Sequence, residues 1–172
     1  MKFTKILKNI PLLLLITFST YSFANNIDGA FGLKFGDYFS NKTSSQVIKF
    51  KPQNPLPGVS NYWVRLTPIS NRIYEIYATD YVDSCNIRYE LDTILESKYG
   101  KPAIYESGSV YSSGVYGKEN IIVLACFSFS THNSFSINYA SPEMRKINKE
   151  EIEKLRLEKF KLRIEKLKSI DL

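Results

Sequence analysis

The chain changes character abruptly at residue 141, and this change constrains its fold more than any other feature. Residues 141–172 consist mainly of Lys, Glu, Leu, Ile and Arg and contain no glycine, whereas residues 25–139 are rich in Tyr, Phe, Ile, Val and Ser in short alternating runs. Helix-forming residues without glycine favour one long helix, and alternating runs favour strands. We therefore predict a globular domain over residues 25–140, followed by a charged C-terminal helix over residues 141–172.

The first 24 residues have the parts of a signal peptide. Lysines at positions 2, 5 and 8 precede an apolar run at residues 10–18, and the sequence Ser22-Phe23-Ala24 has the small residues that a signal peptidase requires. The apolar run, about nine residues, is too short to span a membrane, which takes about 20. We predict cleavage after Ala24, a periplasmic or secreted protein, and no membrane span in the mature chain.

The charge of the chain is concentrated at its two ends. Of the formal net charge of +6, three positive charges belong to the predicted signal peptide, and residues 143–172 hold ten Lys/Arg against seven Asp/Glu. Residues 25–142 hold ten of each and are neutral. A protein that binds nucleic acid concentrates Lys and Arg on its globular surface, so we expect no nucleic-acid partner. One histidine and two cysteines exclude a multi-histidine metal site and a four-cysteine zinc site, and we predict no metal and no cofactor.

The pattern of residues 29–139 predicts an α+β fold. Strands are expected near residues 29–37, 62–67, 73–78, 120–129 and 135–139. A helix is expected from a cap at Asp83 or Ser84 to about Tyr99, ended by Gly100. Its apolar stripe is predicted to be Ile87, Leu91, Ile94 and Leu95, and its acids Glu90, Asp92 and Glu96 are expected to be solvated. The predicted architecture is a small antiparallel sheet covered by one disulfide-linked helix, followed by the long C-terminal helix.

The two cysteines are predicted to form that disulfide. Cys85 falls in the first turn of the predicted middle helix and Cys126 in an apolar strand, and export places both in an oxidising compartment. A redox or nucleophilic thiol is the alternative, but no CxxC spacing is present. His132 is expected in a surface turn, without the serine motif of a hydrolase. We therefore predict no catalytic residue and no enzymatic activity.

Residues 105–117 are the most distinctive segment of the globular domain. Flexible Ser and Gly alternate with tyrosines, a composition typical of binding loops, in which Tyr supplies rigid contact area. The candidate binding residues are Tyr105, Ser107, Tyr111 and Tyr116. An ordinary hairpin explains the same composition, because Ser and Gly make turns and Tyr is common in strands. The sequence leaves both interpretations open.

The C-terminal helix is predicted to begin at Pro142, capped by Ser141, and to end near Ser169. The residues Leu157, Phe160, Ile164 and Leu167 follow a three-four-three spacing along one face. This face fits a helix packed on its own domain, a helix that binds a partner protein or a second copy of the chain, or a helix lying in a membrane surface. The sequence alone does not choose among these three.

Two resemblances accompany these patterns. The Gly-Phe-rich opening at residues 29–37, the stretch ending Lys98-Tyr99-Gly100, the two cysteines, and Ile137-Asn138-Tyr139 before a charged helix together resemble small exported Gram-negative proteins that have no assigned activity. That resemblance implies a periplasmic setting and, as partner, another periplasmic or secreted protein. The string Ser107-Gly108-Ser109-Val110-Tyr111 is similar to the SGxxY motif of periplasmic lysozyme inhibitors, which implies contacts from Ser107 and Tyr111 to a lysozyme active site. The chain departs from those inhibitors, which are small and mostly β, by its two predicted helices.

Overall fold

A computed structural model describes residues 26–40, 45–108 and 111–169 of the chain. The predicted signal peptide and its cleavage point lie outside these residues. Ser109 and Val110, at the centre of the string that resembles the inhibitor motif, lie outside them as well, and so does the side chain of Tyr111.

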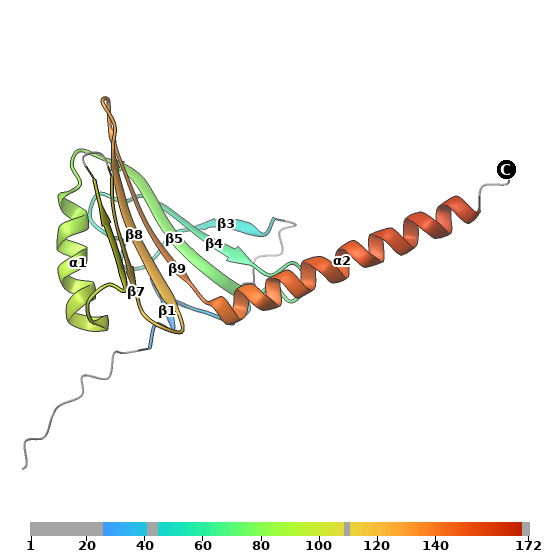
Figure 1. The fold of residues 1–172 in the computed structure, drawn as a ribbon. Helices are drawn as coiled ribbons and strands as arrows, with labels where there is room; N and C mark the ends of the chain where they lie inside the picture. The colour runs from blue at the N-terminus through green and yellow to red at the C-terminus, as the bar shows by residue number, and fades with distance from the viewer. Residues whose placement is uncertain (1–25, 41–44, 109–110, 170–172) are drawn as a thin grey trace, which may run out of the picture.

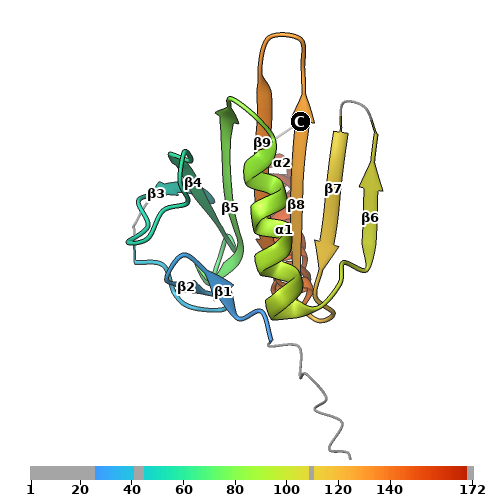
Figure 2. The same ribbon diagram turned by 90° about the vertical axis from the view of Figure 1, so that its left-hand side faces the viewer.

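Seven strands form one antiparallel sheet (Figure 2). From one edge to the other they are β3 (Val47–Phe50), β4 (Asn61–Leu66), β5 (Ile73–Val82), β9 (Asn133–Ala140), β8 (Ile121–Ser128), β7 (Tyr111–Tyr116) and β6 (Ile104–Ser107). The α+β class and the antiparallel pairing are confirmed. The sheet is larger than the small one expected, because β3 and the hairpin β6–β7 extend it at both edges.

The helix α1 (Asn86–Tyr99) covers one face of this sheet, as predicted (Figure 1). Side chains of β8 and β9 alternate, so that Ile122, Leu124 and Cys126 point to the same face as their partners Tyr139, Ile137 and Phe135. Leu95 of α1 packs onto them and is buried. The main core therefore lies between α1 and the central strands.

The disulfide between Cys85 and Cys126 is confirmed, with 5.9 Å between the two Cα atoms. Cys85 occupies the cap position before α1 rather than its first turn. Asp83 and Ser84 do not cap the helix as expected, although the Ser84 hydroxyl accepts a hydrogen bond of 3.2 Å from the backbone N–H of Asn86. The disulfide thus ties the start of α1 to the end of β8.

The opening segment forms a separate two-stranded hairpin instead of the single strand expected near residues 29–37. The strands β1 (Gly29–Ala30) and β2 (Leu33–Lys34) pair across a turn at Phe31 and Gly32, whose φ angles are 54° and 85°. The alternation of apolar residues in this segment is interrupted by the turn. The ring of Phe31 then reaches the main sheet, 5.0 Å from that of Tyr62.

The helix α2 (Pro142–Lys168) begins on the opposite face of the sheet from α1 and then runs away from it (Figure 1). As predicted, Ser141 caps α2, and its hydroxyl accepts a hydrogen bond of 3.3 Å from the backbone N–H of Met144. Among the described residues of α2, only Met144 is buried. Neither helix of the described chain is long and apolar enough to cross a membrane.

Candidate functional site

The Tyr/Ser/Gly segment forms the hairpin β6–β7 at one edge of the sheet, so the hairpin interpretation describes its backbone. Tyr105 lies on β6 with 53% of its surface exposed, and Ser107, the last residue of β6, is also exposed. Tyr111 begins β7 opposite Phe127. Tyr116 ends β7 and is fully buried under α1, so its side chain is not part of the surface. The four candidate residues therefore do not share one exposed site.

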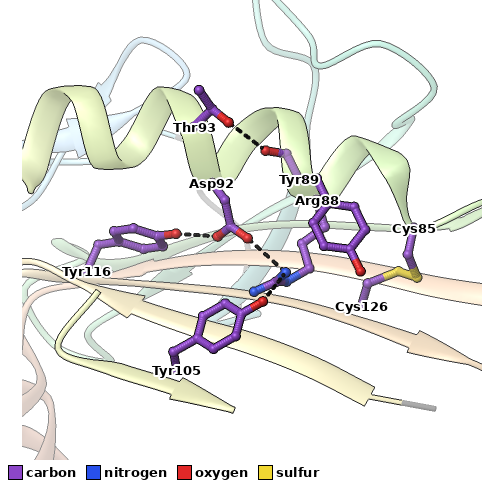
Figure 3. A network of polar contacts seen from close by, with 8 residues as sticks. All are labelled: Cys85, Arg88, Tyr89, Asp92, Thr93, Tyr105, Tyr116 and Cys126. Carbon is purple, nitrogen blue, oxygen red and sulfur yellow. Dashed lines mark hydrogen bonds and ion pairs between the residues drawn. A yellow bond between two sulfur atoms is a disulfide. The ribbon is translucent and has the colours of Figure 1, made fainter. Parts of the chain in front are cut away.

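A polar network holds α1 against this hairpin (Figure 3). Arg88 is fully buried, and its Nη1 lies 2.8 Å from a carboxylate oxygen of Asp92, one turn further along α1. The other carboxylate oxygen of Asp92 accepts a hydrogen bond from the hydroxyl of Tyr116. The rings of Tyr89 and Tyr105 lie beside the guanidinium group, with their centres 5.4 and 5.0 Å from its Cζ. The network joins α1 to both strands of the hairpin.

Two predictions about the faces of α1 are wrong: Asp92 was expected on the solvated face but is largely buried, and Ile94 was expected in the buried stripe but is exposed. Only 14% of the Asp92 side chain is exposed, whereas Ile94 is 58% exposed. Arg88 and Asp92 are four residues apart and lie on the same helical face as the buried Leu95, three residues beyond Asp92. This shared face was the signal in the sequence that could have identified the network.

The chemistry of this network is that of a structural clamp. Burial raises the pKa of Tyr116 well above its ordinary value, and the hydrogen bond to Asp92 raises it further. Tyr116 therefore remains a neutral donor at physiological pH. Arg88 Nε and Nη2 have no hydrogen-bond partner within the described part of the chain. The hydrogen bonds and ring contacts of Arg88, Asp92 and Tyr116 join α1 to the hairpin, and we assign these groups a structural role.

His132 lies in the turn between β8 and β9, exposed as predicted. Its ring packs against Tyr81 and Phe129, and its Nδ1 is 2.9 Å from the Thr131 hydroxyl. An open, mainly polar pocket of about 410 Å³ lies beside this turn and is lined by the turn residues, by the end of β5 and by Asp83. No hydrogen bond joins His132 to a carboxylate in the described ranges, and no group of three or more His, Cys, Asp or Glu that could hold a metal occurs there.

The distal half of α2 carries the apolar face that the sequence had indicated. Leu157, Phe160, Ile164 and Leu167, here called the α2 stripe, are exposed by 52, 62, 36 and 53%. At 100° per residue they occupy an arc of about 80° on the helix. An open groove of about 470 Å³ runs beside Leu157 and Phe160. The described part of the domain does not cover this stripe.

The base of α2 is fixed to the domain by polar contacts. A carboxylate oxygen of Glu151 accepts hydrogen bonds of 2.7 and 3.1 Å from the backbone N–H groups of Ile69 and Ser70, and the other accepts one of 2.5 Å from the Ser70 hydroxyl. Burial raises the pKa of Glu151, but these hydrogen bonds outweigh it and hold the pKa below its usual value. Glu75 is buried on β5, and its Oε1 lies 3.4 Å from Nη2 of Arg145 on α2. The helix is thus anchored at one end and free of the sheet at the other.

The α2 stripe is the candidate functional surface because it joins exposed apolar residues in regular spacing to a helix held away from its own core. Its side chains are apolar and carry no reactive group, so the chemistry of the stripe suits contact with another apolar surface. Comparisons of the chain with protein-family models, with curated proteins and with solved structures found no match in any of the three.

Proposed function

We propose that the chain is an exported, non-catalytic protein, periplasmic or secreted, that binds a partner protein through the α2 stripe. The observation that carries this proposal is the exposure of four large apolar side chains at three-four-three spacing on a projecting helix. A contiguous apolar face that its own domain leaves uncovered is typical of a protein–protein interaction site. The seven-stranded sheet supplies the base of that helix, since Arg145 of α2 lies 3.4 Å from the buried Glu75 of β5.

The proposal concerns the α2 stripe and not nonspecific binding by the exposed apolar residues of the helix in general. Leu162 provides a matched control, because it is 64% exposed on the same helix but lies about 160° or more from Ile164 and Phe160 around the axis. Leu162 and Phe160 are exposed to nearly the same fraction, 64 and 62%, so substituting Leu162 removes a large exposed apolar side chain without altering the stripe.

The experiment is an affinity enrichment from periplasmic extract with three versions of the tagged protein: wild type, Phe160→Ser and Leu162→Ser. We expect a protein that is enriched by the wild type and by Leu162→Ser, and reduced at least about tenfold with Phe160→Ser, because truncating a buried aromatic anchor costs 2 kcal/mol or more at an interface. Equal enrichment by all three versions would contradict the role of the stripe.

A second candidate function is inhibition of lysozyme through the hairpin β6–β7. All four residues of β6 are exposed at the sheet edge, which leaves this hairpin accessible to a partner. On this alternative, purified protein slows lysozyme, and Ser107→Ala combined with Tyr111→Ala relieves the inhibition. Full lysozyme activity in the presence of micromolar protein would remove this candidate.

A further inference from the structure

Charges beside the α2 stripe are arranged asymmetrically around the helix. Arg156 and Arg163 lie within about 40° of one border of the stripe, and Lys161 and Lys168 within about 40° of the other. All four side chains are exposed. Glu158 and Glu165 lie at least about 80° beyond the Leu157 border, on the opposite side of the helix. One further acid, Glu153, lies in line with the stripe one turn before Leu157 and forms an exposed ion pair of 3.7 Å with Arg156. From residue 156 to residue 168 the apolar stripe is therefore bordered on both sides by cations.

We propose that the occupant of the α2 stripe is an acidic amphipathic helix of the partner protein, with apolar residues at heptad spacing and Asp or Glu beside them. This inference rests on the proposed function and names the chemistry of its partner. In a heptad labelled a to g, Leu157 and Ile164 take position a, and Phe160 and Leu167 take position d. The four cations then occupy every e and g position from 156 to 168, where the charges of a facing helix would lie.

A second copy of the chain does not fit this surface. In a parallel pair, each g residue faces an e residue of the other helix, and in an antiparallel pair g faces g and e faces e. Every such pairing of two α2 helices from 156 to 168 brings cation to cation. Like charges at these positions disfavour self-association. Acidic residues on the facing helix would pair with Lys161, Arg163 and Lys168, and a fourth would share Arg156 with the exposed Glu153.

An anionic membrane surface fits less well than a helix. A helix that lies in a membrane interface presents a broad apolar face, while a narrow seam of a and d residues is typical of helix pairing. The α2 stripe is of the narrow kind, with an arc of about 80°. The observations therefore favour an acidic helix over a lipid surface, and vesicle binding serves as an opposing outcome in the test.

The test is an NMR titration of isotope-labelled protein with two synthetic peptides of three heptads. Both peptides carry Leu at a and d; one has Glu and the other Lys at e and g. We expect shift changes confined to α2 with the Glu peptide, affinity at least about tenfold higher than for the Lys peptide, and weakening as salt is raised. Phe160→Ser should abolish the binding and Leu162→Ser should preserve it.

A charge-reversed protein, with Glu at positions 156, 161, 163 and 168, should bind the Lys peptide in preference to the Glu peptide. These positions are solvent-exposed, and a circular dichroism melt checks that the variant stays folded. Equal affinity for both peptides would overturn the acidic partner while leaving the stripe as a binding surface. The inference is also overturned if neither peptide shifts α2 resonances at millimolar concentration, if the protein dimerises through the stripe, or if it binds vesicles of anionic phospholipid more tightly than the Glu peptide.

Discussion

Removing the negative charge of Asp92 should destabilise the protein strongly. In the variant Asp92→Asn the side chain keeps its size and can still accept the hydrogen bond from Tyr116, but Arg88 loses its counter-charge. Arg88 is fully buried, so water does not replace the lost partner. The amide has a single acceptor oxygen, so when this oxygen accepts the hydrogen bond from Tyr116, the NH2 group faces the Arg88 guanidinium, donor to donor. Removing one member of a buried ion pair costs about 3–5 kcal/mol, so we expect a loss of at least about 3 kcal/mol.

The opposite substitution should be much milder. Arg88→Met replaces the buried cation by an apolar side chain of similar length, and Asp92 keeps the Tyr116 hydroxyl and partial access to solvent. Exchanging a buried charge for a well-packed apolar group is often nearly neutral, so we expect a loss of about 1 kcal/mol. The double variant Arg88→Met/Asp92→Asn should be more stable than Asp92→Asn alone, because it no longer buries an unpaired cation.

Urea unfolding of the oxidised protein measures these differences. With a slope of about 2 kcal/mol/M, a loss of 3 kcal/mol lowers the midpoint by about 1.5 M. The reasoning is refuted if Asp92→Asn unfolds within about 0.5 M of the wild type, or if the double variant is no more stable than Asp92→Asn.

Three further predictions concern the contacts around the two helices. Replacing Cys85 and Cys126 by Ala opens a loop with a sequence separation of 41, which should lower the free energy of unfolding by about 4 kcal/mol in a denaturant melt; a loss below about 1 kcal/mol would contradict it. Glu151→Ala should increase hydrogen exchange at the amides of Ile69 and Ser70 and slightly lower the free energy of unfolding, because the lowered folded pKa of Glu151 means that its ionised form stabilises the folded state; in the wild type the same protection of these amides should be lost as pH falls through that pKa. Since the folded pKa of Tyr116 is raised, its contribution is complete below about pH 10 and declines above it. Between pH 8 and 10.5, the free energy of unfolding of Tyr116→Phe should therefore fall less than that of the wild type; an equal fall would contradict the raised pKa of the buried Tyr116 hydroxyl.

The elements with strong periodic patterns could be predicted from the sequence. Apolar spacing and residues that start or stop helices indicated α1 and the cap at Ser141. Alternating apolar residues and turn residues indicated the hairpins around 62–78 and 120–139. The disulfide was predicted from the expected export of the chain and from the expected placement of its two cysteines on a helix and a strand that pack together, and the structure contains it.

The polar interior could not be predicted by counting apolar residues. Arg88 is charged and so fits a solvated helical face, yet it is buried because Asp92 and Tyr105 supply partners from different elements. The absence of a side chain at Gly114 of β7 is explained only by the structure, since a Cβ there would lie 3.1 Å from the Tyr116 ring and 3.4 Å from Asp92 Oδ1. The contacts of Arg88 with Tyr105 and of Gly114 with Asp92 join different elements, which the apolar pattern of either segment does not reveal.

The direction in which α2 leaves the sheet also could not be predicted from the sequence. The three-four-three spacing identified an apolar face of α2, but the same spacing fits a helix packed on its own domain. The contacts of Glu151 with the turn between β4 and β5, and of Arg145 with Glu75, fix the base of α2 and so send its distal half away from the sheet. Only this geometry leaves the stripe exposed.

Site-specific photo-crosslinking in the living cell tests the central claim most directly. A photoreactive amino acid is placed at position 160 in one variant and at position 162 in another, and mass spectrometry maps the crosslinked peptides. We predict that position 160 crosslinks to a segment of another exported protein with apolar residues at heptad spacing and flanking Asp or Glu, and that position 162 does not. No crosslink from position 160, equal crosslinking from both positions, or crosslinks between two copies of this chain would contradict the claim.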